Sequence, residues 1–315
     1  MSSLLANEFV PSDDHAAIRE GVRSVVTRFG DDYWLGRDDD GVFPFEFHRA
    51  MADAGWLGIT MPEEYGGAGL GVTEAAIMMH EVASHGGGMA AASAVHINLF
   101  GPHPIVVKGT PDQKARWVPR LVAGDDQCAF GFTEPDAGLN TTRIKTFAQK
   151  VSGGYVVHGQ KVWTSTAQVA NKIMLLTRTT RYEDCARPTD GITIFYTDLD
   201  RSKIEVRLIP KMGRKAVDSN AIFIDGLFIP DSDRIGEEGK GFSYILHSLN
   251  PERVLIAAEA IGIGQDALRR ATRYAKEYHV ERLFREVSIA RLAPVTEQLI
   301  LSFIAEKVLD LPRSY

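Results

Sequence analysis

The feature that most constrains the fold of this chain is the order of three sequence patterns. Up to about residue 122, apolar residues recur at three- and four-residue steps, as at Ile18, Val22 and Val25, and this spacing predicts amphipathic helices. Near Ala129, short β-branched and aromatic runs separated by turn residues take over. After residue 241 the pattern becomes helical again. The order of helices, strands and helices predicts an α+β chain.

The middle pattern predicts a small β-barrel or sandwich, because short strands follow one another without intervening helices. Five runs carry this pattern: 155–158, 172–177, 192–197, 204–209 and 221–229. In the last part, residues 254–267 are apolar almost all round, which is typical of a helix buried inside a bundle. We therefore expect a helical domain at 1–126, a β domain at 127–236 and a helical domain at 237–315.

The composition excludes several classes of function. With 44% hydrophobic and 24% charged residues, the chain resembles an ordinary water-soluble protein. A net charge of −6 without a Lys/Arg run argues against nucleic acid as a partner. Cys128 and Cys185 are the only cysteines, too few for a disulfide framework or a cysteine-rich metal site. Residues 1–14 lack a signal-peptide pattern, and no apolar stretch approaches the roughly 20 residues that span a bilayer. We expect a cytoplasmic protein without a membrane span.

One histidine pair resembles a metal motif, but its spacing argues against that function. His85 lies five residues after His80, with Glu81 between them. Five residues turn a helix by roughly 500°, so the two imidazoles point to different faces, whereas helical zinc motifs use a four-residue spacing. We therefore expect no metal site.

Two short segments carry the strongest functional signal. The first reads Thr-Glu-Pro-Asp-Ala-Gly at 133–138. The second, at 159–165, looks like the closing strand of a β-hairpin and places Trp163 beside two hydroxyl residues. Taken singly, each segment is explained by a capped turn or a half-buried strand. Taken together they suit a flavin, because hydroxyls and backbone amides match the polar edge of its ring and an indole covers the apolar face.

These segments, with Lys-Met-Gly at 211–213 and Gly-Lys-Gly-Phe at 239–242, resemble the flavin-binding signature of the acyl-CoA dehydrogenase family. The resemblance covers nearly the whole chain. It implies a helical N-terminal domain, a middle β domain and a C-terminal helical bundle. It also implies FAD-dependent α,β-dehydrogenation of an acyl-CoA thioester to a trans-2-enoyl-CoA. The electrons would pass to an electron-transfer flavoprotein, and the intact family forms homodimers or homotetramers.

The same resemblance assigns cofactor-binding residues. Thr133 would lie against the pyrimidine edge of the flavin, Ser165 would donate near N5, and Trp163 would shield the ring. The backbone from Phe130 to Gly138 would supply further hydrogen bonds. The cofactor-binding residues are therefore expected to be Phe130, Phe132, Thr133, Gly138, Trp163, Thr164 and Ser165.

On the substrate side, the expected residues are Leu139, Asn250 and Arg253. The family usually has Ser-Asp where this chain has Leu139-Asn140, so one hydroxyl expected to touch the thioester ligand is absent.

The catalytic base implied by the resemblance is Glu252. Helix-capping preferences alone favour a different interpretation, a helix start. Asn250 would be the N-cap, Pro251 would occupy the first helical position, and Glu252 would lie near the positive end of the helix dipole. Family members take their carboxylate either from this position or from one near the C-terminus. In this chain Pro294 occupies the second position, so the resemblance assigns the role to Glu252, with Arg253 tuning its carboxylate.

The C-terminal part differs from the family by an internal gap. Family members have about 70 more residues, enough for roughly two bundle helices. Residues 271–277 resemble the first C-terminal helix and residues 278–282 resemble the start of the last one. The lost segment contains Arg-x-x-Phe-Gly and Gly-Gly-x-Gly motifs, which in the family hold the FAD diphosphate and adenosine across a subunit interface.

Two structural consequences of this gap are expected. Residues 253–291 could form one helix about 58 Å long, and the shortened bundle would expose Ile256, Ile263 and Leu268. Two alternatives to a working dehydrogenase stay open. One is an inactive remnant that pairs with a full-length paralogue, and the other, less favoured, is an acyl-CoA oxidase that uses O₂.

Overall fold

The computed structural model describes residues 12–288 and 296–312. Contacts divide the chain at Ile263/Gly264 into two compact units, and each is described by itself. This division does not test the expected domain boundaries at 126/127 and 236/237, which stay a prediction. Pro294, at the alternative base position, lies outside the described residues.

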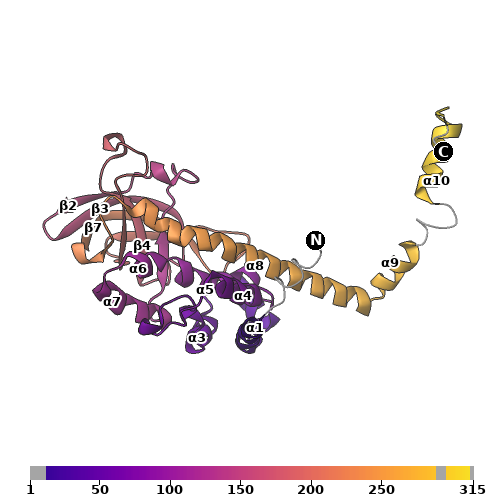
Figure 1. Cartoon of the computed structure of the whole chain (residues 1–315), viewed down its shortest axis with the longest axis horizontal. Coiled ribbons are helices and arrows are strands. Elements are labelled where there is room, and N and C mark those ends of the chain that lie inside the picture. The colour runs from indigo at the N-terminus through magenta and orange to yellow at the C-terminus, as the bar shows by residue number, and fades with distance from the viewer. Residues whose placement is uncertain (1–11, 289–295, 313–315) are drawn as a thin grey trace. The chain divides into compact units, whose positions relative to one another are not determined.

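The N-terminal part of the first unit is helical, as its apolar spacing predicts. Val22 of α1 and Met78 of α4 are buried in one hydrophobic core, because each lies on the apolar stripe of its helix. Thr110 caps α7, its hydroxyl accepting from the N–H of Gln113 (3.2 Å), and Pro111 occupies the first helical position. In order, these helices are α1 (Asp13–Val26), α2 (Asp31–Asp40), α3 (Phe45–Asp53), α4 (Val72–Ala83), α5 (Gly88–Phe100), α6 (His103–Lys108) and α7 (Pro111–Val122). Figure 1 shows them in indigo and purple beside the strands.

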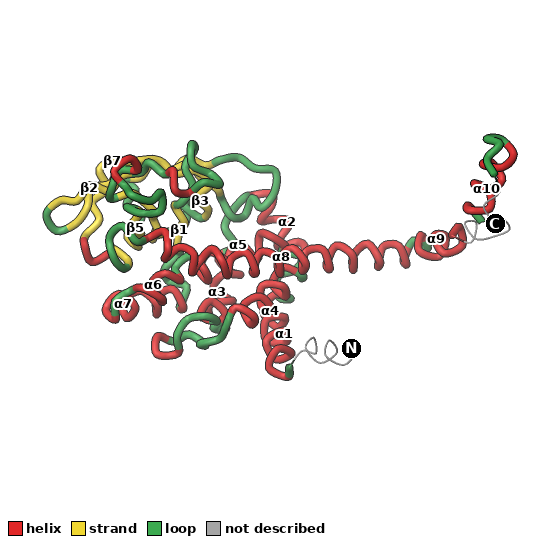
Figure 2. The backbone as a smooth tube through the Cα atoms, turned by 45° about the horizontal axis from the view of Figure 1, so that its top comes forward, coloured by secondary structure: helices red, strands yellow, loops and turns green. Residues whose placement is uncertain are grey.

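The strands form one sheet in the order β6-β7-β3-β2-β4-β5-β8, with β1 parallel to β4. All five predicted runs lie on strands of this sheet, and β1, β2 and β8 were not anticipated. The strands are β1 (Cys128–Gly131), β2 (Phe147–Val151), β3 (Gly154–Ser165), β4 (Lys172–Arg178), β5 (Ile192–Asp198), β6 (Ile204–Leu208), β7 (Ser219–Pro230) and β8 (Arg234–Ile235). They gather in one part of the first unit (yellow in Figure 2).

The segment at 159–165 does not close a hairpin, so that expectation is wrong. The hairpin of β2 and β3 ends at the pair Phe147–His158, and β3 then continues alongside β7 as far as Ser165. The register shifts between Lys161 and Thr164, and Trp163 has φ +60° within this irregularity. A bulge of this kind leaves residues out of the ladder and re-aims their side chains.

Helix α8 (Gly241–Glu277) corrects a second expectation, because Asn250-Pro251 is not a helix start. The helix begins at Gly241, and Pro251 lies inside it. The local N-cap signal is overridden because Tyr244 and Ile245, in the preceding turns, are buried in a core cluster beside the sheet. Their burial stabilises helical turns that the dipeptide alone would not predict.

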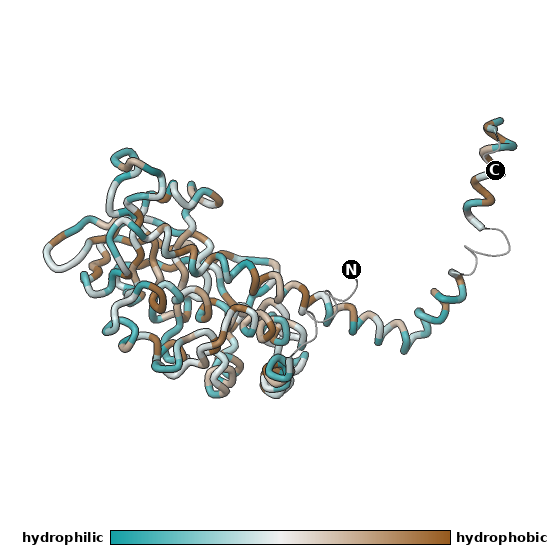
Figure 3. Tube along the Cα trace, in the orientation of Figure 1, coloured by the Kyte–Doolittle hydropathy of each residue, from teal (hydrophilic) through white to brown (hydrophobic). Residues whose placement is uncertain are grey.

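Within the first unit, α8 is buried on one face only. Leu255 is buried, whereas Ile261 is exposed and so is Ile256, as predicted for the shortened bundle. The burial all round that the apolar pattern suggested is therefore wrong. Hydrophobic and hydrophilic residues alternate along the helix (Figure 3). Gly262 makes a close helix–helix contact, since a Cβ there would lie 2.4 Å from the carbonyl oxygen of His80. This approach half-buries Ile263, which was expected to be exposed.

The second unit contains the end of α8, α9 (Val280–Ser288) and α10 (Glu297–Lys307). The expected single helix through the join is wrong, because α8 ends at Glu277 and His279 adopts φ +58°, a left-handed conformation that interrupts a helix. The end of that expected helix lies outside the described residues. Leu268 is exposed, as predicted, and so is Phe284 of α9.

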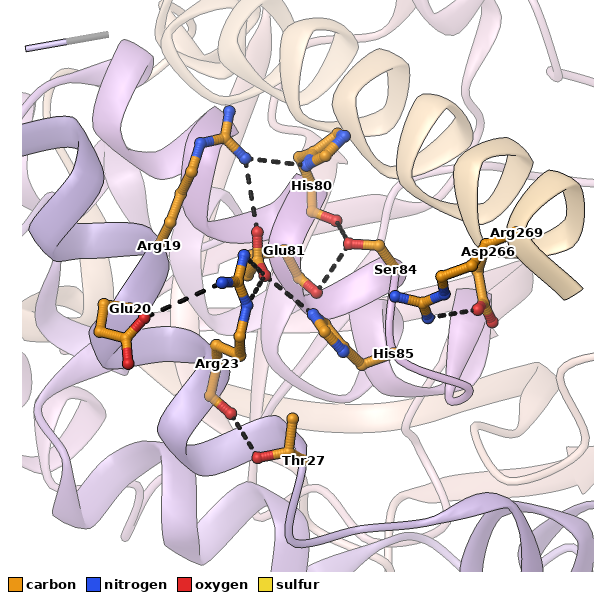
Figure 4. Close-up of polar contacts among 10 residues, drawn as sticks. All are labelled: Arg19, Glu20, Arg23, Thr27, His80, Glu81, Ser84, His85, Asp266 and Arg269. Atoms are coloured by element: carbon orange, nitrogen blue, oxygen red, sulfur yellow. Dashed lines mark hydrogen bonds and ion pairs between the residues drawn. The ribbon is translucent and has the colours of Figure 1, made fainter. Parts of the chain in front are cut away.

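A buried carboxylate connects α1 to α4 in the first unit (Figure 4). Glu81 pairs with Arg23 (2.8 Å) and Arg19 (3.4 Å), and His85 Nε2 lies 2.8 Å from its Oε1. Burial opposes ionisation of Glu81, but His85 and Arg23 outweigh it and lower its pKa. Among residues 12–288 and 296–312, no group of His, Cys, Asp and Glu could hold a metal ion. No helix in those ranges is long and apolar enough to cross a membrane.

Candidate active site

A pocket of about 310 Å³ opens in the first unit between β1, β3, α5 and α8. Its lining includes six of the residues predicted from sequence: Phe130, Phe132, Thr133, Trp163, Ser165 and Glu252. Residues from the sheet side, around Trp163 and Ser165, and the carboxylate of α8 therefore line one cavity. The aromatic rings of Phe130 and Phe132 stack in its wall with centroids 3.7 Å apart.

The two sequence motifs are joined directly to each other. The N–H of Val162 donates to the carbonyl oxygen of Thr133 (2.9 Å). Lys161 Nζ donates to Glu134 Oε1 (2.8 Å) and to the carbonyl oxygen of Phe132 (3.2 Å). Glu134 and Lys161 thus hold Thr133 beside the bulge that carries Trp163, which gives these two charged residues a structural role.

This ion pair is buried on both sides. The Lys161 side chain has 0% exposure and that of Glu134 has 5%. Burial lowers the pKa of Lys161 to about 8, against the opposing effect of Glu134. Burial opposes ionisation of Glu134, but the Lys161 ammonium and hydrogen bonds from Thr146 and Lys145 outweigh it and lower the pKa of that carboxyl. Both groups are therefore charged at neutral pH.

Strained backbone surrounds the same pocket. Trp163 (φ +60°), Thr166 (φ +61°) and Arg214 (φ +56°) adopt left-handed conformations that non-glycine residues rarely occupy. Trp163 and Arg214 line the cavity. Such strain persists only where the surrounding contacts fix the residue, and it concentrates at functional sites.

Arg214 is a residue that the sequence analysis missed. Its guanidinium donates to the hydroxyls of Ser93 (3.2 Å), Ser165 (3.1 Å) and Ser219 (3.0 Å). Burial lowers its pKa, while the carboxylates of Asp218 and Glu259 oppose that shift. The only sequence signal was its position directly after the Lys-Met-Gly run at 211–213.

Glu252 lies half-buried on the face of α8 that lines the pocket. Burial is the largest cause of a raised pKa at this carboxyl; His96 and Arg253 oppose the shift and Glu259 adds to it. Glu259 follows two helical turns later, on the same face. Its Oε1 lies 2.6 Å from Nδ1 of His96, and both side chains are buried.

His96, Ser93 and Glu259 were also missed. A signal for Glu259 was its seven-residue spacing from Glu252, which repeats one helix face. Ser93 and His96, like Asn98, are polar residues within the mostly apolar helix α5, and such residues often mark a polar site.

Five predicted site residues are not part of the pocket wall. Thr164 has a buried side chain, and its carbonyl oxygen accepts from Asn220 (2.9 Å). Gly138 and Leu139 lie in an exposed turn after β1. Asn250 and Arg253 are exposed on α8, where Arg253 Nη1 donates to Asn250 Oδ1 (2.6 Å).

Three acyl-CoA dehydrogenase family models match the chain: the N-terminal domain over residues 12–125, the middle domain over 129–227 and the C-terminal domain over 239–280. The chain belongs to the acyl-CoA dehydrogenase family, and FAD is its cofactor.

Individual relatives agree with this assignment. Benzylmalonyl-CoA dehydrogenase of Aromatoleum aromaticum is 34% identical, covering 86% of this chain and 70% of the relative. Acyl-CoA dehydrogenase FadE12 of Mycobacterium tuberculosis is 27% identical, and the match covers 98% of this chain and 99% of the relative. A glutaryl-coenzyme A dehydrogenase complex with glutaryl-CoA is similar with a TM-score of 0.80 and 27% identity, covering 85% of this chain and 67% of that one. The structure of butyryl-CoA dehydrogenase of Megasphaera elsdenii is similar at 23% identity and a TM-score of 0.79, and the match covers 97% of this chain and 82% of that one. At this identity the likeness shows the fold alone.

The comparisons also show that the C-terminal domain is truncated. Its family model matches only residues 239–280. The alignment with FadE12 extends over 399 residues, at least 84 more than the 315 in this chain. The expected join at 277/278 coincides with the end of α8.

Proposed function

We propose that this chain oxidises an acyl-CoA thioester to a trans-2-enoyl-CoA, with Glu252 as the base. The observation that supports this function is that one pocket contains both the carboxylate of Glu252 and the flavin-side residues Thr133, Trp163 and Ser165. From the family membership we also propose an electron-transfer flavoprotein as the electron acceptor and a cytoplasmic homo-oligomer as the active form.

The residues present suit a flavin. Thr133 and Ser165 offer hydroxyls at the pocket wall, and Trp163 is 60% exposed, so much of its indole is available to cover a ring. We propose that these three residues contact the flavin, with backbone from Phe130 to Gly138 adding hydrogen bonds. Gly138, Leu139, Thr164, Asn250 and Arg253 remain proposed contacts with no support from the pocket lining.

When bound, FAD would supply the acceptor for a hydride from the β-carbon of the substrate. Glu252 would take the proton from the α-carbon. The electron pair of that C–H bond would form the new C=C bond, and the pair of the β-C–H bond would leave with the hydride. Burial raises the pKa of Glu252, and this brings the base closer to the acidity of the proton that it must remove. Phe100, Phe130 and Ile256 supply apolar wall to the pocket, where the acyl chain would lie.

The first test is the visible spectrum of the purified chain, with and without added FAD. We expect a yellow protein with one flavin per chain, whose absorption bleaches when an acyl-CoA is added anaerobically. A panel of straight, branched and aromatic acyl-CoAs would define the substrate. A protein that stays colourless with excess FAD would contradict the proposal.

A protein that stays colourless would favour the alternative function, in which the chain is an FAD-deficient remnant that pairs with a full-length paralogue. The specific observation in its favour is the truncated C-terminal domain, because the family's diphosphate- and adenosine-holding motifs belong to the missing segment. Co-expression with a full-length paralogue, followed by size-exclusion chromatography, would detect such a heteromer.

The raised pKa of Glu252 predicts the pH dependence of kcat/KM. The base must be ionised, so activity should rise with pH through a pKa above the ordinary value of 4.5. The Glu259 carboxylate also raises the pKa of Glu252, so Glu259→Gln should move the rise of kcat/KM to lower pH. The Gln amide can still hydrogen bond to His96. A pH profile with the same limb in both proteins would contradict this electrostatic coupling.

A further inference from the structure

The hydrogen bonds around Arg214 determine which way the Ser165 hydroxyl can point. A guanidinium has five N–H donors and no acceptor, so in each of its contacts the serine oxygen must accept. Arg214 Nη2 lies 3.1 Å from Ser165 Oγ, which therefore accepts there. The Ser165 proton has to point elsewhere, and within residues 12–288 and 296–312 no hydrogen bond donated by the Ser165 hydroxyl is found. Ser165 lines the pocket, so its O–H is available to an acceptor bound there.

Arg214 is itself fixed in place by several contacts. Ser219, the cross-strand partner of Ser165, accepts from the same Nη2 (3.0 Å), and Ser93 of α5 accepts from Nη1 (3.2 Å). The nearby carboxylates of Asp218 and Glu259 favour its positive charge. These contacts hold a left-handed backbone at φ +56°, which would otherwise be disfavoured.

We propose that Arg214 is a positioning residue that makes Ser165 an obligatory hydrogen-bond donor toward the flavin. This inference rests on the proposed function, in which Ser165 contacts the flavin ring. A hydroxyl that accepts from a cation is a stronger donor, because successive hydrogen bonds polarise one another. A donor oriented before the ligand arrives needs no reorganisation, which is the basis of electrostatic preorganisation. Without Arg214, the Ser165 hydroxyl could rotate and would be as free to accept as to donate.

The test is a double-mutant cycle with Arg214→Met and Ser165→Ala, measured as FAD affinity and as the reduction potential of bound FAD. Neither measurement requires turnover of an acyl-CoA. We expect each single variant to bind FAD about 10- to 100-fold more weakly, the size expected for losing a hydrogen bond that involves a charged group. We also expect both to shift the potential in the same direction and by a similar amount. The double variant should add little to either effect, since both changes remove the same oriented donor.

Two further variants separate positioning from simple structural support. Arg214→Lys keeps a cation that can donate to Ser165 and should restore part of the wild-type potential. Ser202→Ala removes an exposed serine hydroxyl that donates to Asp200, outside the contacts of Arg214, and should leave the potential close to that of the wild type. If the effects of Arg214→Met and Ser165→Ala on the potential are additive, the inference is overturned while the proposed function stands. A wild-type chain that binds no FAD overturns both.

Discussion

Replacing Glu252 by Gln is expected to abolish bleaching of the bound flavin by acyl-CoA, with a loss of at least about 10²- to 10⁴-fold in rate. Gln keeps nearly the same shape and can still hydrogen bond in the half-buried site on α8. It cannot accept the α-proton, so the chemical step loses its base. Stopped-flow absorption of the FAD-loaded protein measures this directly, and the FAD content should stay unchanged.

A matched control is Glu205→Gln, which changes an exposed carboxylate on β6 that is paired with Arg207. It should bleach at the wild-type rate. If Glu252→Gln also bleached at that rate, the assignment of the base would be wrong, and because position 294 is Pro, a different carboxylate of the pocket would have to be sought. Glu259, two turns further along α8, would then be the first to examine.

Breaking the buried pair of Lys161 and Glu134 should produce the largest loss of stability in the sheet. Lys161→Met leaves the Glu134 carboxylate uncompensated in a site where the lysine side chain has 0% exposure and the glutamate 5%. Removing one partner of such a pair typically costs about 3–5 kcal/mol. Denaturant unfolding of the apoprotein would show the loss as a lower transition midpoint. FAD affinity should fall with it, because the pair joins the two flavin-side segments.

The double variant Lys161→Met with Glu134→Leu distinguishes charge from packing. Replacing both charges by apolar groups should recover much of the loss, since a buried ion pair is often no more stabilising than hydrophobic residues of similar volume. Arg187→Ala, which breaks an exposed pair with Asp190, should change stability little. A double variant as unstable as Lys161→Met would contradict the electrostatic explanation.

The dependence of the unfolding free energy on pH in the acid range gives an independent check on Glu134. Its folded pKa is lowered below the ordinary value of 4.5, so the folded state binds fewer protons than the unfolded one in that range. The contribution of Glu134 to the stability of the folded state is fully present above pH 4.5 and is lost as the pH falls through its folded pKa. Compared with the wild type, Glu134→Gln should therefore show a weaker dependence of the unfolding free energy on pH below 4.5.

The sequence by itself determined the helix, strand and helix order, the apolar stripes of α1 and α4, and the cap of α7. These features follow from local periodicity and capping chemistry, which short-range spacing encodes. The family resemblance went further and selected Thr133, Trp163, Ser165 and Glu252, which the structure brings into one pocket. It did not reveal why Glu134 and Lys161 accompany them, because a buried ion pair between residues 27 positions apart has no local signature.

Tertiary structure alone decided the rest. The early start of α8 depends on burial of Tyr244 and Ile245 in a cluster shared by the sheet, helices α6 and α7 and the loops between them, which outweighs the local signal of Asn250-Pro251. The pairing of His96 with Glu259 joins residues 163 positions apart. Arg214 reaches Ser165 because a left-handed backbone turns it toward a neighbouring strand. Contacts of this kind depend on how separate elements pack, and local spacing carries no information about that packing.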